Sequence, residues 1–176
     1  THFPSADMYN SKLTGAEVTV QPDGQYDVAI GGVALVAGDT ATAMTVAGTP
    51  AAVSIGGTAL PAGFSGELGA VVDVLNTTLP AYKKGLDDIA TAFAQQVNDQ
   101  HKLGKGLDGS TGLDLFTIDP ADPAATLGVA ITDPRQIAAA AATAGDYDPG
   151  NADALSRATT VESDYSTLVT SFGSTV

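Results

Sequence analysis

A hydrophobic repeat from Ser65 to His101 is the feature that most constrains this chain. Its apolar residues recur almost always three or four positions apart, which is the period of an amphipathic α-helix with one side toward a protein core. The residues that we assign to this structural helix face are Leu68, Val72, Leu75, Leu79, Tyr82, Leu86, Ile89, Phe93 and Val97. An apolar face of this length has to be covered by other elements, so the repeat predicts a fold built around one long helical segment.

The ends and the middle of this segment carry local signals. Ser65 is a good N-cap residue, because its hydroxyl can accept a hydrogen bond from a free backbone N–H of the first turn. Gly104 follows His101 and is typical of a helix end. Pro80 lies inside the segment, lacks a backbone donor and clashes with the preceding turn, so we expect a kink or a break near Thr78–Leu79. The two alternatives are one bent helix or two helices in series.

Upstream of the helix, residues 16–60 show the two-residue alternation of β-strands. Pro22-Asp23-Gly24 is typical of a hairpin turn, and Gly31-Gly32 supplies the next break. The predicted strands are Glu17–Val20, Tyr26–Ile30, Val33–Val36, Ala43–Val46 and Ala52–Ile55. We expect a small antiparallel meander, and we place a domain boundary between a β-rich region 1–62 and a helical core domain 63–176.

The remainder of the chain mixes loop and helix patterns. Residues 104–125 are rich in Gly, Asp and Pro and predict a loop. Asp133 and Pro134 mark the start of a helix that continues through an alanine-rich stretch to Thr143. Further predicted elements are a helix over Asp7–Leu13, a strand over Leu127–Ile131 and a last helix over Asn151–Ser171. The fold class is therefore α+β, with the long helical segment packed against the C-terminal helix and a small antiparallel β meander.

Charge and composition exclude several classes of function. The chain has 176 residues, seven of them Lys or Arg, and a net charge of −13, whereas nucleic acids and anionic membranes require clustered basic side chains. Its apolar runs are shorter than the roughly 20 residues of a membrane-spanning helix. Cysteine is absent, which excludes disulfides and thiolate chemistry. We therefore expect no nucleic-acid partner and no membrane partner.

The candidates for catalysis have simpler interpretations. His2 and His101 are the only histidines, and a histidine beside a carboxylate can act in acid–base catalysis. His101 lies at the predicted C-terminal end of the long helix, where a capping or packing role explains it better. That helix also carries four carboxylates, Glu67, Asp73, Asp87 and Asp88. We interpret them as solvated charges rather than as the carboxylate pair of a glycosidase. We predict no catalytic residue and no cofactor.

Oxygen-bearing side chains between Asp146 and Asp153 suggest a second class of function. Asp146, Asp148, Asn151 and Asp153 are spaced like the ligands of a calcium loop, since calcium prefers six to eight oxygen ligands. The EF-hand pattern fails, because Asn151 stands where that loop needs glycine and Arg157 where it needs glutamate. We favour a turn followed by a helix N-cap. A calcium-dependent extracellular adhesin or surface-binding module is the alternative hypothesis.

Short motifs follow one another through the second half of the chain. They are Gly66-Glu67-Leu68-Gly69-Ala70, Leu79-Pro80-Ala81-Tyr82, Leu86-Asp87-Asp88-Ile89-Ala90, Val97-Asn98-Asp99-Gln100-His101, Gly106-Leu107-Asp108-Gly109, Leu115-Phe116, Ile131-Thr132-Asp133-Pro134, Ile137-Ala138-Ala139-Ala140, Gly150-Asn151-Ala152-Asp153-Ala154-Leu155 and the Tyr-x-x-Leu-Val stretch at 165–169. No single motif is strong, but their order is specific. Together they resemble the family of flagellar hook-associated protein 1, well over residues 65–176 and poorly over residues 1–15.

This resemblance implies a structural adaptor at the hook–filament junction of the bacterial flagellum, exported by the flagellar secretion apparatus and acting outside the cell. The implied partners are other copies of itself in a ring, the hook protein and the next hook-associated protein. Family members carry long N- and C-terminal helices that are missing here. The resemblance therefore implies a central fragment, which we expect to be monomeric in solution. Its apolar helix face either packs within the chain, which we favour, or forms a seam for a partner.

Overall fold

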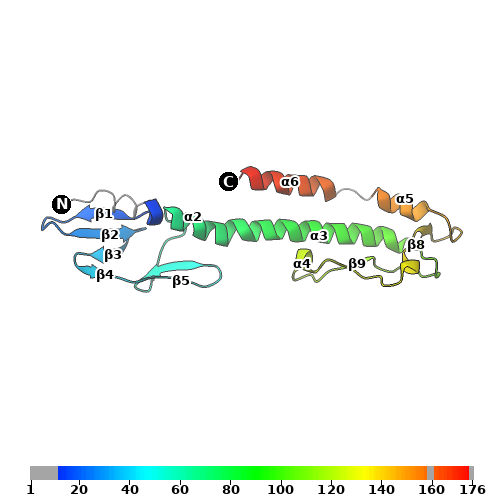
Figure 1. Cartoon of the computed structure of the whole chain (residues 1–176), viewed down its shortest axis with the longest axis horizontal. Helices are drawn as coiled ribbons and strands as arrows, with labels where there is room; N and C mark the ends of the chain where they lie inside the picture. Colours follow the sequence, from blue (N-terminus) through cyan, green and yellow to red (C-terminus); the bar gives the residue numbers. More distant parts are fainter. Residues whose placement is uncertain (1–11, 158–160, 175–176) are drawn as a thin grey trace. The chain divides into compact units, whose positions relative to one another are not determined.

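The structure is a computed structural model that describes residues 12–157 and 161–174 (Figure 1). The chain folds as two compact units, Thr1–Ala81 and Tyr82–Val176. The domain boundary that we predict after residue 62 rests on the sequence pattern and stays a prediction. Most of the predicted helix Asp7–Leu13 lies outside the described residues. Within the described ranges, no helix is long and apolar enough to cross a membrane.

Two small antiparallel sheets form most of the first unit. One has the strand order β1-β2-β3-β4 and the other β5-β6-β7. Their strands are β1 (Glu17–Val20), β2 (Tyr26–Ile30), β3 (Val33–Ala37), β4 (Thr40–Ala41), β5 (Met44–Ala47), β6 (Ala52–Ile55) and β7 (Thr58–Ala59). Each predicted strand of this region is confirmed to within one residue. The single predicted meander is instead divided between two sheets, because β5 pairs with β6 and not with β4.

The core of the first unit joins residues from both sheets. Its buried members are Ala16, Ile30, Val53, Ile55 and Phe64. Leu68 and Val72, the first two residues of the predicted helix face, pack against this cluster. A fully buried Val, Ile or Phe side chain contributes about 1.5–3 kcal/mol to the free energy of unfolding, relative to an exposed one. The alternation that predicts the strands therefore also predicts which of their residues point inward.

The N-cap of the long helical segment lies one residue later than predicted. It consists of α2 (Glu67–Asp73), the π-helix η1 (Val74–Thr78) and α3 (Leu79–Lys102). The N-cap is Gly66 with φ of 91°, and Ser65 is not the cap. A Cβ atom on Gly66 would lie 2.2 Å from the backbone nitrogen of Gly15. The close approach of the two backbones, together with the positive φ, explains why glycine occupies this position.

Helical conformation continues through Pro80, so the alternative of two helices in series is wrong. In the π-helix that precedes it, the Leu79 N–H donates to the carbonyl of Val74, five residues earlier. A proline ring normally collides with the carbonyl four residues before it, here that of Asn76. The wider π turn lies where this collision would occur, which is a common way for a helix to accommodate an irregularity.

The second unit contains the C-terminal part of the long helix and several short elements. They are β8 (Gly104–Lys105), β9 (Phe116–Thr117), α4 (Pro123–Thr126), β10 (Gly128–Val129), the 3-10 helix η2 (Pro134–Gln136), β11 (Ala140–Ala141), α5 (Gly150–Ser156) and α6 (Val161–Ser174). β8 pairs with β11 and β9 pairs with β10, both antiparallel. The predicted loop 104–125 therefore contains two paired strands and the start of a short helix.

Two helix predictions in this unit are wrong in extent. Asp133 is the predicted N-cap, and its carboxylate does accept a hydrogen bond from the Arg135 N–H at 3.0 Å. The helix nevertheless ends at Gln136, and the alanine-rich stretch beyond it contains β11. The last predicted helix is not continuous, because α5 ends at Ser156 and α6 begins at Val161.

The predicted packing of the long helix against the C-terminal helix is confirmed. α6 lies alongside α3 (Figure 1), and the rings of Tyr82 and Phe172 are 4.1 Å apart between centroids. Gly85 contributes to this contact, since a Cβ atom there would lie 2.6 Å from a methyl group of Leu168. A small residue on α3 thus allows the two helices to approach closely.

Candidate functional site

Polar side chains in the last turns of α3 hold the segment that follows the helix. They are Asn98, Gln100 and His101, joined by Asn151 of α5, and we call these four residues the polar hub. His101 is fully buried and Asn151 is 4% exposed. A buried polar group without a hydrogen-bond partner costs about 1–3 kcal/mol. The partners of the hub residues therefore decide how this part of the chain can fold.

His101 joins two stretches of backbone through its two ring nitrogens. Nδ1 lies 2.7 Å from the carbonyl oxygen of Leu113, and Nε2 lies 2.9 Å from the N–H of Ala138. A nitrogen that accepts from an N–H carries no proton, so Nδ1 is the donor and the imidazole is neutral. This geometry agrees with the packing interpretation of His101. His2, the other histidine, lies outside the described residues.

Asn151 reaches the same stretch of backbone from α5. Its Nδ2 donates to the carbonyl oxygen of Ala138, and its Oδ1 accepts from Nε2 of Gln100 at 2.7 Å. Gly104 lies directly against this amide, because a Cβ atom there would be 2.2 Å from Nδ2 of Asn151. The carbonyl of Ala139 accepts from the N–H groups of Asn151 and Ala152 in α5. These bonds use backbone groups that a helix over the alanine-rich stretch would require.

Asn98 fixes β9 beside α3. Its Oδ1 accepts from the N–H groups of Leu115 and Phe116 at 2.9 and 2.8 Å, and its Nδ2 donates to the carbonyl of Phe116 at 2.8 Å. The ring of Phe116 also contacts Phe93, with centroids 5.1 Å apart. A single amide side chain thus holds β9, which also pairs with β10, against α3 and brings Phe116 to Phe93.

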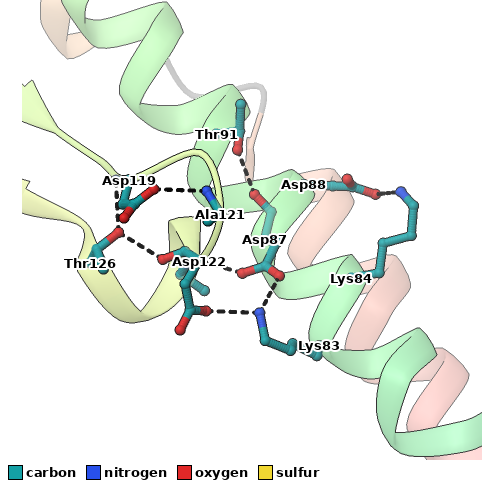
Figure 2. Close-up of polar contacts among 10 residues, drawn as sticks. Lys83, Lys84, Asp87, Asp88, Thr91, Asp119, Ala121, Asp122 and Thr126 are labelled. Carbon is teal, nitrogen blue, oxygen red and sulfur yellow. Dashed lines mark hydrogen bonds and ion pairs between the residues drawn. The ribbon is translucent and has the colours of Figure 1, made fainter. Parts of the chain in front are cut away.

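A second polar cluster anchors α4 to α3, as Figure 2 shows. Nζ of Lys83 lies 2.7 Å from the carboxylate of Asp87 and 2.8 Å from that of Asp122. The other oxygen of Asp87 accepts from the N–H of Ala124, in the first turn of α4, at 3.0 Å. Asp87 therefore combines an ion pair with the capping of a free helix N–H.

The charges of this cluster stabilise one another. The hydrogen bond from Lys83, followed by that from the Ala124 N–H, lowers the pKa of Asp87 below its ordinary range. The hydrogen bond to Asp122, followed by that to Asp87, raises the pKa of Lys83. Both groups are thus held in their charged forms, although Lys83 and Asp122 are exposed enough for solvent to screen the pair.

The nine residues of the predicted helix face lie in different environments. Leu68 and Val72 contact the core of the first unit, and Val97 is buried in the second. Tyr82, Ile89 and Phe93 are half-buried. Leu75, Leu79 and Leu86 remain 48%, 50% and 42% exposed. The common role of the nine residues as one face stays a prediction, because three of them are largely uncovered by the described residues.

The carboxylates that suggest a calcium loop or a glycosidase pair are used separately. Asp148 accepts from the N–H groups of Ala141 and Gly150, both at 3.1 Å, and Asp146 forms an ion pair with Lys105 at 2.9 Å. The helix carboxylates make local contacts with Lys12, Thr77, Lys83 and Lys84. In the part of the chain that the structure describes, no group of three or more His, Asp or Glu could hold a metal ion.

Sequence reasoning misses the structural importance of three asparagines. Asn98 and Asn151 belong to the polar hub. Asn76, in η1, accepts from the N–H of Ala51 and donates to its carbonyl, both at 2.7 Å, and so joins the β5–β6 turn to the helix. Asparagine has a low helix propensity, so its presence inside a predicted helix is a usable sign that the side chain bonds to backbone elsewhere.

The geometry defines a structural module, in which side chains bind neighbouring backbone to hold short elements against a long helix. Comparisons with known proteins identify the family to which this structural module belongs. Residues 11–116 match the family described as the flagellar hook-associated protein FlgK helical domain. Because the match covers more than half of the chain, the chain belongs to the flagellar hook-associated protein FlgK family.

Individual relatives agree with this assignment. The chain is 31% identical over 121 residues to flagellar hook-associated protein 1 of Escherichia coli strain K12 and to that of Salmonella typhimurium strain LT2. Each match covers 61% of this chain and 22% of the relative. The chain thus spans about a fifth of the length of these curated relatives.

Proposed function

We propose that this chain is part of a structural component of the bacterial flagellum, an adaptor at the junction between hook and filament. In this role it acts outside the cell through subunit packing and catalyses no reaction. Its partners are further copies of itself in a ring, the hook protein and the next hook-associated protein. The flagellar export apparatus delivers it to the growing structure. Membership of the family supports this proposal, together with a fold in which the hub side chains serve to position backbone.

The observation that carries the proposal is the location of the motif Val97-Asn98-Asp99-Gln100-His101. Val97 is buried, Asn98 and His101 bind backbone from the segment that follows, and Gln100 binds the side chain of Asn151. Asp99 is exposed. Other motifs of the same resemblance supply the bound backbone, at Leu115-Phe116 and at Ala138, and a further hub side chain, Asn151. The family pattern therefore coincides with the contacts that fix the shape of the second unit.

A chimaera tests this function. In the Escherichia coli relative, the segment that matches this chain is replaced by the corresponding residues of this chain. The gene is then expressed in cells that lack their own hook-associated protein 1. We expect the chimaera to restore filaments on hooks, measured by electron microscopy and by swimming in soft agar. We expect His101→Ala in the chimaera to reduce filament number, because it removes both ring bonds.

Asp99→Ala is the matched control, since Asp99 lies in the same motif but is exposed. It should leave the number of filaments unchanged. A chimaera that is exported and stable but never supports a filament would contradict the proposed role. Equal loss from the His101 and Asp99 variants would contradict the importance of the hub.

A further inference from the structure

The long helical segment changes its register within the first unit. Leu68 and Val72 pack against the core of that unit, and Leu75 and Leu79 continue the same spacing. In an uninterrupted α-helix these four side chains would lie within about 60° of one another, because each residue advances the helix by about 100°. The structure instead has the π-helix η1 before Leu79, and Leu79 is 50% exposed. The spacing of the sequence therefore fits an α turn, whereas the structure contains a wider turn.

The wider turn rotates the side chains that follow it. An N–H in a π turn donates to the carbonyl five residues earlier, and an N–H in an α turn donates to the carbonyl four residues earlier. Side chains after η1 are therefore displaced by about one residue, or roughly 100°, from the directions that a continuous α-helix would give them. If α2 stays on the core and η1 tightens into an α turn, Leu79 takes the direction that Pro80 has in the structure.

The direction of Pro80 leads to a cavity beside the helix. Leu75 and Pro80 line this cavity from the helix, and residues 48–51 line it from the β5–β6 turn. All of these residues belong to the first unit. None of the described residues that line the cavity is charged, so Leu79 would remove apolar surface from water on entering it. The first unit thus combines an exposed leucine with a cavity that lies one residue position away around the helix.

Two features of the structure favour the wider turn over the α turn. The side chain of Asn76, within η1, accepts from the N–H of Ala51 and donates to its carbonyl, both at 2.7 Å. Tightening of η1 would rotate Asn76 by part of the shift of roughly 100° and break both bonds. Pro80 acts separately, because its ring would collide with the carbonyl of Asn76 in an α turn. Each feature therefore disfavours the α turn without the other.

We propose that η1 is a register switch in the long helix, and that Asn76 and Pro80 are the two constraints that hold it in the π register. In this register Asn76 is bonded to Ala51 and Leu79 is exposed. In the second register η1 is α-helical, both bonds are broken and Leu79 lies in the cavity. The exchange turns the side chains after η1 by about 100° around the helix axis. A subunit that covers the exposed Leu79 stabilises the π register, because it binds only that state. The proposal goes beyond the junction role.

Nuclear magnetic resonance on the isolated chain tests the switch, because scalar couplings across hydrogen bonds identify the carbonyl that accepts from the Leu79 N–H. In the parent chain the acceptor should be Val74, as in the structure. In the double variant Asn76→Ala, Pro80→Ala, we expect the acceptor to be Leu75. The Leu79 methyl groups should also become less accessible to a soluble paramagnetic probe, because they move from the surface into the cavity. Both substitutions raise helix propensity, so we expect the double variant to fold.

Single variants and a matched double variant test the two constraints. Asn76→Ala alone and Pro80→Ala alone should each keep Val74 as the acceptor, because the other constraint remains. Thr77→Ala combined with Pro80→Ala is the matched control, since Thr77 lies in the same π turn and its hydroxyl donates to Asp73 within the helix. We expect this control to keep the π register, because Asn76 retains its bonds. Circular dichroism measures the helix content of each variant.

Val74 as the acceptor in the Asn76→Ala, Pro80→Ala variant would overturn the proposal, because the π register would then not depend on the two constraints. A shift of the acceptor to Leu75 in a single variant or in the Thr77→Ala, Pro80→Ala control would also overturn it. Loss of the folded state in the Asn76→Ala, Pro80→Ala variant would show that no second register is available, and the proposal would again be wrong. The chimaera tests the junction role separately, so either proposal can fail while the other stands.

Discussion

Each of the two units of this chain is stabilised by a different kind of internal interaction. The first has an apolar core that contains Ile30, Val53 and Ile55, contributed by two sheets. The second buries the polar residues His101 and Asn151, which bind the backbone of short, weakly paired elements. An apolar core tolerates substitutions that keep its volume and polarity. A polar hub needs every donor and acceptor matched. Substitutions that remove side-chain volume should therefore destabilise the first unit most, and substitutions that remove hydrogen bonds should destabilise the second unit most.

The largest expected effect follows from truncation of the apolar core. Ile30 is fully buried, so Ile30→Ala removes burial energy and leaves a cavity. We expect it to lower the free energy of unfolding by about 2–5 kcal/mol. Urea unfolding followed by circular dichroism measures the change, with Val20→Ala on exposed β1 as the control. A loss no larger than that of the control would show that this cluster is not the core in solution.

Breaking the polar hub should have a smaller and more local effect. Asn151→Ala removes the partner of Gln100 Nε2 and of the Ala138 carbonyl. Gln100 is half-buried and water can reach it, so the main cost is that of one buried carbonyl without a partner, about 1–3 kcal/mol. Amide hydrogen exchange should speed up at Ala138, Ala152 and neighbouring residues of the second unit, and should change little in β2 and β6. Asp153→Ala, on the exposed side of α5, is the matched control. Faster exchange throughout both units would contradict a local role.

The exposed part of the helix face provides a third and weaker test. Leu86 is 42% exposed, so Leu86→Asp in the isolated chain should cost less than about 1 kcal/mol, as surface substitutions usually do. Thermal unfolding measures this. Phe93→Asp is the comparison, since Phe93 is half-buried and contacts Phe116. A carboxylate placed there loses part of its hydration and should cost considerably more. Equal and large losses for both variants would show that Leu86 is covered in solution.

The contrast between the units also explains what the sequence could predict. Alternation in β1, β2 and β6 is local, so strand positions and the inward residues Ile30, Val53 and Ile55 follow directly from it. The alanine-rich stretch after Gln136 has a high helix propensity. Its backbone instead accepts partners from distant residues, such as His101, 37 positions away from Ala138. Helix propensity and hydrophobic periodicity are local properties and do not show that a distant side chain binds the backbone. The prediction of a helix over the alanine-rich stretch was therefore wrong.

The candidate site could be predicted from the sequence only in part. The resemblance includes Asn98, Gln100, His101 and Asn151 within its motifs. Single-residue reasoning gives His101 a capping or packing role and places Asn151 in a turn before a helix, with a calcium ligand as the alternative. The structure agrees with the packing role of His101 and adds the network that joins the two residues. Asparagine and glutamine near a helix end, followed by a glycine-rich segment such as the one from Gly104, are the sign that could have led to it.

The smallest expected effect concerns the charged cluster that anchors α4. The bonds from Lys83 and Ala124 lower the pKa of Asp87, so the ionised form stabilises the folded state. This contribution is complete above the ordinary aspartate pKa of about 4 and is lost as pH falls through the lower pKa of the folded state. Asp87→Asn should therefore reduce the urea midpoint at pH 6, and the difference from the parent should narrow as pH falls below about 4.

Asp88→Asn is the matched control for this last variant. Asp88 and its partner Lys84 are 64% and 74% exposed, so solvent screens the pair and its removal should have little effect on the midpoint. A difference between parent and Asp87→Asn that stays constant from pH 6 to pH 3 would show that Asp87 stabilises α4 without its charge. A difference that widens on acidification would contradict the sign of the linkage, because protonated aspartate and asparagine are both neutral at the same position.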